Sequence, residues 1–111
     1  MELDVAVRQE GDFAVVAVAG ELDVYTAPKL EKVLTELIAG GSVNVVVDLG
    51  GVSFLDSTGL GAMVKGLKRA KEAGGTLQVV ASDERVVKVF RITGLDAVMS
   101  LQGDLDAVLG A

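Results

Sequence analysis

The sequence predicts a single α/β domain with a mixed, mostly parallel sheet of four to five strands, an N-terminal antiparallel hairpin and about four helices. Apolar runs typical of buried strands alternate with segments whose apolar residues recur at helical spacing. A length of 111 residues suits one domain, so residues 1–111 are expected to fold together. Half of the residues (50%) are hydrophobic but 4% are aromatic, so the core must consist mostly of Val, Leu, Ile and Ala.

The chain opens with two segments that predict a hairpin. Leu3, Val5 and Val7 alternate with polar or small residues, which is the pattern of a strand with one face in water. Residues 10–12, with a glycine in the middle, favour a tight turn. Residues 13–19 are almost all apolar, which is typical of a strand covered on both faces.

The first helix is expected after a loop at residues 20–25. Thr26 is a candidate N-cap, and Pro28 suits the first turn because the N–H that it lacks would have no partner there. Apolar residues then follow at helical spacing, namely Leu30, Val33, Leu34, Leu37 and Ile38. Gly40 and Gly41 end this pattern.

The middle of the chain reads as a strand, a loop and the start of a helix. Residues 43–49 form a dense apolar run, and a helical pattern extends from about Ser57 to Ala73. Asp56 and Ser57 stand where this helix begins. Their side-chain oxygens can accept the free backbone N–H groups of a first turn.

The second helix carries four basic side chains on the face opposite its apolar residues. They are Lys65, Lys68, Arg69 and Lys71. Two interpretations are open, an ordinary solvated face and a basic patch that helps to attract an acidic partner.

The C-terminal third is expected to begin with a strand at residues 76–81, after Gly74 and Gly75. A short helix should follow, capped by Ser82 and ended by Gly94. A short edge strand is expected around Val98.

A last helix through Leu109 is expected, with Asp104 as its cap. Strands and helices alternate after the hairpin, so the later strands should be parallel and joined by right-handed crossovers.

Composition excludes several classes of function. The formal net charge of −6 argues against non-specific binding to DNA and against docking on anionic lipid. The sequence has no Cys and no His, so disulfides, thiolate chemistry and the usual neutral-pH base are absent. No signal peptide and no apolar run long enough to span a bilayer is visible. A cytoplasmic protein without nucleic-acid or membrane partners is expected.

The motifs of nucleotide-binding proteins and of serine hydrolases are incomplete in this sequence. Gly61 and Gly66 have the spacing of a P-loop, but the lysine that should follow is displaced to Lys68. Gly59 and Gly61 begin a dinucleotide motif, but Val64 stands at the third glycine position. A serine triad of the usual kind cannot be built without His.

Three aspartates, Asp23, Asp48 and Asp56, are expected at one edge of the sheet, where ligands bind in open α/β folds. Asp48 ends a strand, as the phosphoacceptor of a receiver domain does, but the acidic pair and the lysine of such domains are not evident. Asp48 is expected instead to hydrogen-bond the loop after its strand. Three carboxylates without His make a weak metal or acid–base site, so no enzymatic activity and no cofactor are expected.

Ser57 is the candidate modification site. One interpretation is that Asp56 or Ser57 is merely a helix cap. The other is that Ser57 carries a regulatory phosphate, because a helix N-terminus favours an anion through its dipole and free N–H groups. Thr58 is the alternative acceptor. Gly59 and Gly61 add no side chain to the first turn, so another molecule could approach its backbone closely.

Four segments, in order, resemble one protein family. Residues 54–61, Phe-Leu-Asp-Ser-Thr-Gly-Leu-Gly, are similar to the phosphorylation loop of the anti-sigma factor antagonists, which are single-domain proteins of the STAS fold. The other segments are Gly20-Glu21-Leu22-Asp23 with Thr26, Gly74-Gly75 before an apolar run, and Phe90-Arg91-Ile92-Thr93-Gly94-Leu95. The resemblance covers nearly the whole chain and implies the same α/β layout.

The resemblance also implies a binding switch controlled by phosphorylation. In that family the unphosphorylated antagonist binds an anti-sigma factor that is also a serine kinase, and the sigma factor is released. The kinase uses ATP to phosphorylate the serine that matches Ser57, which switches binding off. A separate metal-dependent phosphatase reverses the modification. ATP and magnesium therefore belong to the partners.

The expected partner-binding residues are Asp23, Asp56, Ser57, Thr58, Gly59 and Gly61. For the two aspartates, capping of their own loops is an equally open interpretation. The alternative function is a constitutive interaction or scaffold subunit of a stress-signalling or lipid-transport complex, settings in which STAS domains also occur. A monomer or a weak dimer is expected.

Overall fold

Strands and helices follow one another in residues 2–110, the part of the chain that the computed structural model describes. In chain order they are β1 (Leu3–Glu10), β2 (Phe13–Leu22), α1 (Ala27–Ala39), β3 (Asn44–Leu55), α2 (Ser57–Glu72), β4 (Thr76–Val80), α3 (Glu84–Thr93), α4 (Leu95–Val98) and α5 (Leu105–Leu109). The two end residues of the predicted domain, 1 and 111, lie outside the described part.

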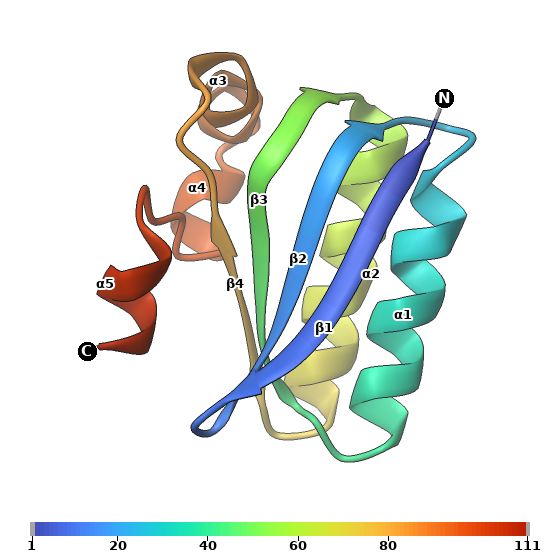
Figure 1. The fold of residues 1–111 in the computed structure, drawn as a ribbon, viewed down its shortest axis with the longest axis vertical. Coiled ribbons are helices and arrows are strands. Elements are labelled where there is room, and N and C mark those ends of the chain that lie inside the picture. Colours follow the sequence, from blue (N-terminus) through green and yellow to red (C-terminus); the bar gives the residue numbers. More distant parts are fainter. Residues whose placement is uncertain (1, 111) are drawn as a thin grey trace.

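The four strands form one sheet in the order β1-β2-β3-β4 (Figure 1). β1 and β2 pair antiparallel, with Glu10 opposite Phe13 across a turn in which Gly11 has a φ of 61°. β2, β3 and β4 are parallel, so the predicted mixed, mostly parallel sheet is confirmed. The carboxyl ends of the parallel strands meet at one edge, and α1, α2 and α3 begin there.

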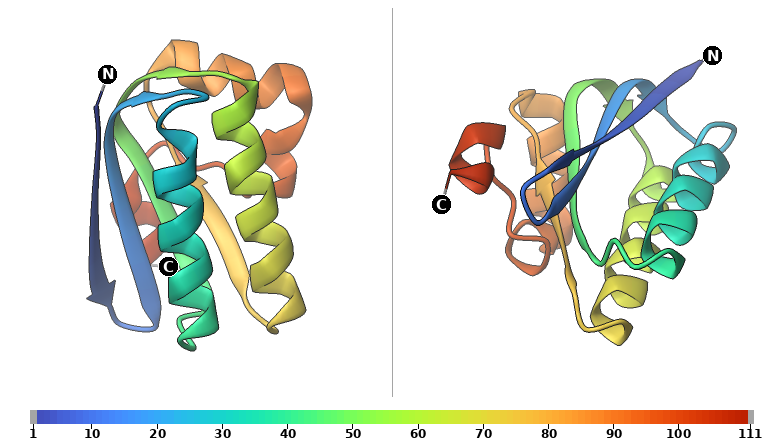
Figure 2. Two further views of the ribbon diagram at one scale, coloured as in Figure 1. Left: turned by 90° about the vertical axis from the view of Figure 1, so that its right-hand side faces the viewer. Right: turned by 60° about the horizontal axis from the view of Figure 1, so that its bottom comes forward.

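Helices cover both faces of this sheet. α1 and α2 lie side by side over one face, and α3, α4 and α5 gather at the β4 side (Figure 2). The main core lies under α1 and α2, where Leu30, Met63 and Val47 are completely buried. A smaller core lies on the opposite face, where Val108 of α5 packs with valines of β2, β3 and β4. No helix within residues 2–110 has both the length and the apolar character needed to cross a membrane.

β3 is longer than predicted and includes residues that were expected to form a loop. It continues through Gly50 and Gly51 to Leu55. A Cβ on Gly51 would lie 2.7 Å from the Cβ of Ala19, so this glycine allows close approach of β2 and β3. The pairing of these strands shifts register at two places, which absorbs the irregular stretch. The glycine pair therefore belongs to the strand and not to the loop that was expected after residue 49.

The predicted edge strand around Val98 is wrong, because Leu95–Val98 is the short helix α4. The strand-like contact in this region is one isolated parallel bridge between Val80 and Gln102. Residues 2–110 therefore contain four strands, the lower of the predicted numbers, and five helices instead of about four.

Two predicted helix caps also need correction. The N-cap of α3 is Asp83, whose Oδ1 accepts a hydrogen bond from the Arg85 N–H at 2.9 Å, and Ser82 precedes it. Thr26 occupies the cap position of α1, but its side chain does not cap the helix. Its hydroxyl instead donates to the Glu21 carbonyl at 2.7 Å. The cap predicted for α5 is confirmed, because Asp104 accepts from the backbone of that helix.

Candidate functional site

The start of α2 is capped by Asp56. This residue has an extended backbone (φ −106°, ψ −178°), and its Oδ1 accepts hydrogen bonds from the N–H groups of Thr58 at 2.9 Å and Gly59 at 3.0 Å. These donors belong to the second and third residues of the helix, the positions that a capping oxygen reaches. Of the two candidate caps in the sequence, Asp56 is the one in use.

Ser57 and Thr58 are the first two residues of α2, and both are exposed. Neither hydroxyl has a hydrogen-bond partner within residues 2–110. Two N–H groups of the first turn are already bound by Asp56, so they are not free to bind an anion. The serine hydroxyl thus stands in solvent at a helix start whose donors are partly occupied.

The loop between β2 and α1 lies directly against this helix start. The Asp56 N–H donates to the Leu22 carbonyl at 3.1 Å, which links the end of β2 to the entry of α2. Gly59 fills the space between them, because a Cβ there would lie 2.6 Å from the Leu22 Cγ and 3.0 Å from the Leu55 Cδ1. The end of β2 and the entry of α2 are therefore packed as one unit.

This packing shows that the role predicted for Gly59, an open approach to the helix backbone, is wrong. Gly59 is buried and faces the core, so it does not leave the helix backbone open to another molecule. Gly61 differs, because no atom lies within 4 Å of a Cβ built there. The expected open approach along the first turn applies to Gly61 alone.

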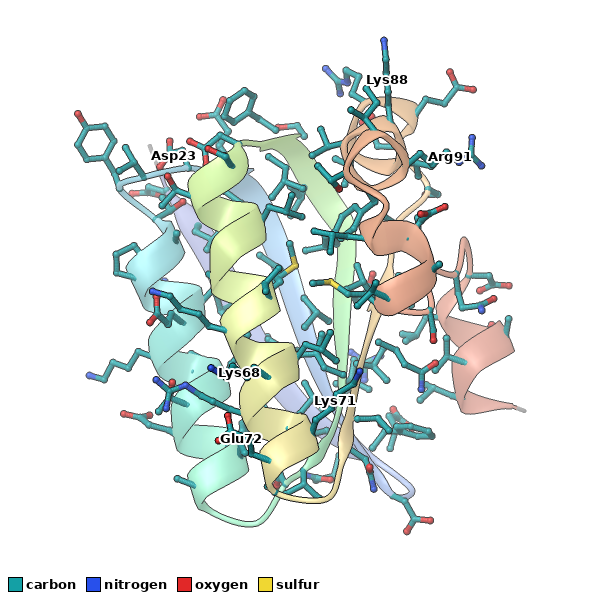
Figure 3. The ribbon with its side chains drawn as sticks, turned by 180° about the vertical axis from the view of Figure 1, so that it is seen from behind. Asp23, Lys68, Lys71, Glu72, Lys88 and Arg91 are labelled. Carbon is teal, nitrogen blue, oxygen red and sulfur yellow. The ribbon has the colours of Figure 1, made fainter. Side chains whose placement is uncertain are left out.

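Asp23 lies at the same edge of the sheet but is used inside its own loop (Figure 3). It is 4% exposed, and its Oδ1 accepts from the backbone N–H groups of Tyr25 at 2.9 Å and Thr26 at 3.0 Å. The contacts of Asp23 are therefore those of a residue that caps its own loop. Any effect of Asp23 on a partner would act through the shape of this loop.

Three large apolar side chains are exposed near this helix start, two in the loop between β2 and α1 and one at the end of β3. Tyr25 is 84% exposed, Val24 is 55% exposed and Phe54, one strand position before Leu55, is 47% exposed. None of these three residues was predicted as a candidate site residue. The available signal was that the one tyrosine of the chain falls in a polar loop, where nothing requires an aromatic ring.

Asp48 does not join Asp23 and Asp56 in a common site. Its Oδ1 accepts from the Gly50 N–H at 2.9 Å, as predicted, although Gly50 belongs to β3 and not to a loop. Within residues 2–110, no three acidic side chains come together in a group that could hold a metal ion.

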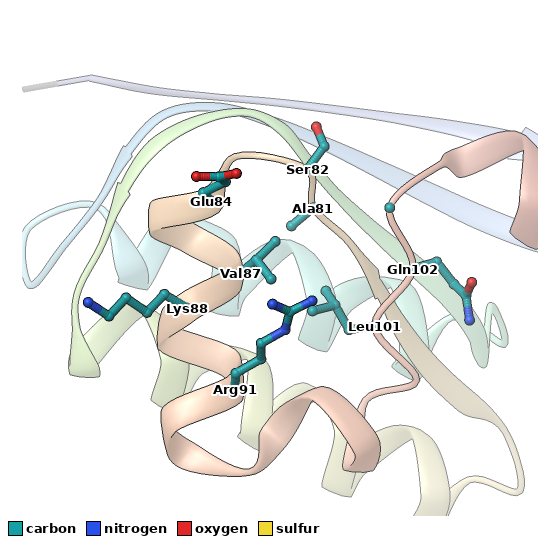
Figure 4. Close-up of a pocket in the computed structure, with 9 residues that line it drawn as sticks. Ala81, Ser82, Glu84, Val87, Lys88, Arg91, Leu101 and Gln102 are labelled. Atoms are coloured by element: carbon teal, nitrogen blue, oxygen red, sulfur yellow. The ribbon is translucent and has the colours of Figure 1, made fainter.

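A separate hollow of about 690 Å³ lies between α3 and the segment that follows α4 (Figure 4). Its walls are formed by Ala81, Ser82, Glu84, Val87, Lys88, Arg91, Leu101, Gln102 and Gly103. None of the predicted site residues lines it. Nearby, the side-chain hydrogen bond from Arg85 at 2.8 Å lowers the pKa of Asp83 to about 2 and raises the pKa of Arg85.

Comparison with known proteins identifies relatives over most of the chain. Residues 4–108 match the family model of the STAS domain. The anti-sigma-B factor antagonist of Staphylococcus epidermidis is 42% identical over 99 residues, which are 89% of this chain and 92% of that protein. The Staphylococcus aureus antagonist of the same name is 40% identical with the same coverage.

A solved structure is similar over nearly the full length. The crystal structure of an anti-sigma factor antagonist from Mycobacterium paratuberculosis superposes with a TM-score of 0.90 at 31% identity, over 98% of this chain and 92% of that one. The resemblance predicted from the four sequence segments is confirmed.

Proposed function

This chain belongs to the STAS domain family and, within it, to the anti-sigma factor antagonists, and we propose that it acts as such an antagonist under the control of phosphorylation at Ser57. In its unphosphorylated form it binds an anti-sigma factor that is also a serine kinase, and the sigma factor is freed. Phosphorylation at Ser57 ends this binding, and a phosphatase restores it. The chain itself contributes no catalysis, since ATP and magnesium are bound by the kinase.

The observation that carries the proposal is the position of Ser57. An exposed serine is the first residue of a helix whose entry is packed against the end of β2, and Val24, Tyr25 and Phe54 are exposed at the same edge of the sheet. Tyrosine is among the residues that most often dominate the energy of protein interfaces. The proposed acceptor hydroxyl therefore shares this edge with an exposed aromatic side chain suited to dock a partner.

The contacts of Asp56 explain how a phosphate on Ser57 would act. A phosphate adds about −1.5 to −2 charges. Asp56 already binds two N–H groups of the first turn, so the helix start cannot neutralise the added charge fully. The phosphate would remain exposed beside the Asp56 carboxylate, within the proposed docking surface.

Repulsion at the interface can supply enough free energy to switch binding off. Like charges or unpaired polar groups pressed together in an interface cost several kcal/mol. Each ~1.4 kcal/mol changes the affinity about tenfold. Repulsion and bulk at the contact are therefore sufficient, and the domain need not refold.

The test is to incubate the purified chain with the anti-sigma kinase of its source organism, ATP and magnesium, and to map the modified residue by mass spectrometry. Phosphate is expected on Ser57, and Ser57→Ala should abolish incorporation. Thr58→Ala is the matched control, because it removes the neighbouring exposed hydroxyl and should leave incorporation intact. Incorporation that survives Ser57→Ala and is lost in Thr58→Ala would move the switch to Thr58. The absence of any incorporation would favour a constitutive scaffold role.

A further inference from the structure

Positive charge is concentrated on α2. The chain has 16 acidic and 10 basic residues, but α2 alone carries four basic residues and a single acidic one. The helix that presents Ser57 is thus the most basic helix of an acidic protein, ahead of α3, which carries three basic residues and one acidic residue.

Three of the basic residues share one face of this helix. Lys65, Lys68 and Arg69, with Glu72, follow the i, i+3, i+4, i+7 spacing, and together they line a shallow hollow of about 390 Å³. We call Lys65, Lys68 and Arg69 the basic face. Four residues before Lys65, the same side of the helix passes Gly61, which is half-buried but has no atom within 4 Å of a Cβ built there, and then reaches the exposed Ser57. One strip along α2, which no side chain of another element covers at Gly61, therefore connects the proposed phosphoacceptor with the basic face.

Only some of the basic residues of α2 are explained by a stabilising effect on the helix itself. Arg69 and Lys71 lie in the last turn, where cations interact favourably with the helix dipole. Lys65 and Lys68 lie before that turn. Lys65 pairs with Glu31 at 3.5 Å, but its side chain is 63% exposed, so the pair is a loose surface contact. Within residues 2–110, Lys68 and Arg69 form no ion pair.

We propose that the basic face of α2 is a second contact for the partner that reads Ser57, and that it receives an acidic surface of the anti-sigma kinase. The inference rests on the proposed function and adds the charge of the partner's surface to it. An acidic partner surface accounts for both ends of the strip, since it is attracted by Lys68 and Arg69 and repelled by a phosphate on Ser57.

Ser57 and the basic face lie far enough apart along α2 for the repulsion at one and the attraction at the other to act separately. At about 1.5 Å per residue, Lys68 lies roughly 16 Å along the axis from Ser57. This distance is about twice the Debye length of ~8 Å at physiological ionic strength. A phosphate on Ser57 would therefore not neutralise the basic face. Charges at the edge of an interface act mainly on the association rate and its salt dependence, so the basic face should steer the encounter.

The test compares two double charge reversals. Lys68→Glu with Arg69→Glu changes the basic face, and Lys88→Glu with Arg91→Glu is the matched control on α3, a different part of the surface (Figure 3). Each reversal changes the net charge by −2, so each pair takes it from −6 to −10. Association with the unphosphorylated anti-sigma kinase is measured by stopped flow over a range of salt concentrations, beside Ser57→Asp. Circular dichroism checks folding, and Lys68→Gln with Arg69→Gln is a milder version.

Reversal of the basic face should slow association at low salt about tenfold, and the difference should shrink as salt is raised. The control pair should change the rate less than about twofold. Equal effects of the two pairs, or no effect of the first, would overturn the inference. If Ser57→Asp still abolishes binding in that case, the proposed function stands without it. If Ser57→Asp binds normally, the proposed function itself fails.

Discussion

The substitution Gly59→Ala is predicted to destabilise the domain, although alanine is the better helix former. The added Cβ would lie 2.6 Å from the Leu22 Cγ and 2.9 Å from the Leu22 carbonyl oxygen, well inside the 3.4 Å at which ordinary contact begins. The carbonyl cannot move freely, because it accepts the Asp56 N–H at 3.1 Å. The end of β2 and the entry of α2 would both have to shift.

The two opposing effects can be given magnitudes. Forcing an extra carbon into a packed site typically costs about 1–3 kcal/mol. Replacing glycine by alanine in a helix returns up to about 1 kcal/mol. We therefore expect Gly59→Ala to lower the free energy of unfolding by about 1–2 kcal/mol.

Gly61→Ala is the matched control, because it makes the same change in the same turn with no atom within 4 Å of the new Cβ. It should raise the free energy of unfolding by about 0.5–1 kcal/mol. Urea unfolding monitored by circular dichroism measures both variants, and their midpoints of thermal unfolding should differ by about 8 °C. Equal stabilities for the two variants would show that Gly59 is not packed against Leu22. The end of β2 and the entry of α2 would then not form one packed unit.

Three further predictions follow from the same site and its surroundings. Asp56→Ala removes the cap of α2 and should cost about 1 kcal/mol in thermal unfolding, whereas Asp56→Asn should cost less because the amide oxygen can still accept. Tyr25→Ala should leave the unfolding midpoint unchanged and weaken binding of the anti-sigma kinase by about 2 kcal/mol, measured by calorimetry; unchanged affinity would remove Tyr25 from the docking surface. Arg85→Gln should raise the pKa of Asp83 from about 2 toward 3.8, which an NMR titration of the carboxyl group measures. Because the folded-state pKa is the depressed one, the pair stabilises the fold above about pH 4, and the variant should approach the wild type as the pH falls toward 2.

The sequence predicted the layout of the sheet because its signals are local. The alternation in Leu3–Val7 and the helical spacing of the two long helices are local patterns, and the structure buries Leu3, Leu30 and Met63, although it leaves Val7 44% exposed. The Asp56 cap was also predictable, since a capping side chain acts on its own backbone two and three residues away.

The errors arose where distant residues decide the structure. Gly50 and Gly51 are turn formers by composition, but Gly51 pairs with Ala19 of β2, and its missing side chain leaves room for that pairing. The short apolar run around Val98 fits a strand or a helix equally well, and no local signal separates the two. Cap assignment at Ser82 or Asp83 depends on where β4 ends, which the sequence does not specify to one residue.

In the candidate site, too, the features set by local sequence were predictable and those set by distant residues were not. Ser57 and its cap could be found from motif spacing, but the inward direction of Gly59 depends on Leu22, which is 37 positions earlier in the chain. The exposure of Tyr25 and Phe54 is likewise a property of the folded chain and not of the local sequence. The part of the site that contacts its own helix was therefore predictable, and the part formed between the end of β2 and the entry of α2 was not.

The most direct test is the affinity of the purified chain for the anti-sigma kinase, measured by calorimetry for the wild type, for Ser57→Ala and for the form phosphorylated on Ser57. We expect the first two to bind equally and the phosphorylated form to bind at least about tenfold more weakly. Equal affinity of all three forms would contradict the switch.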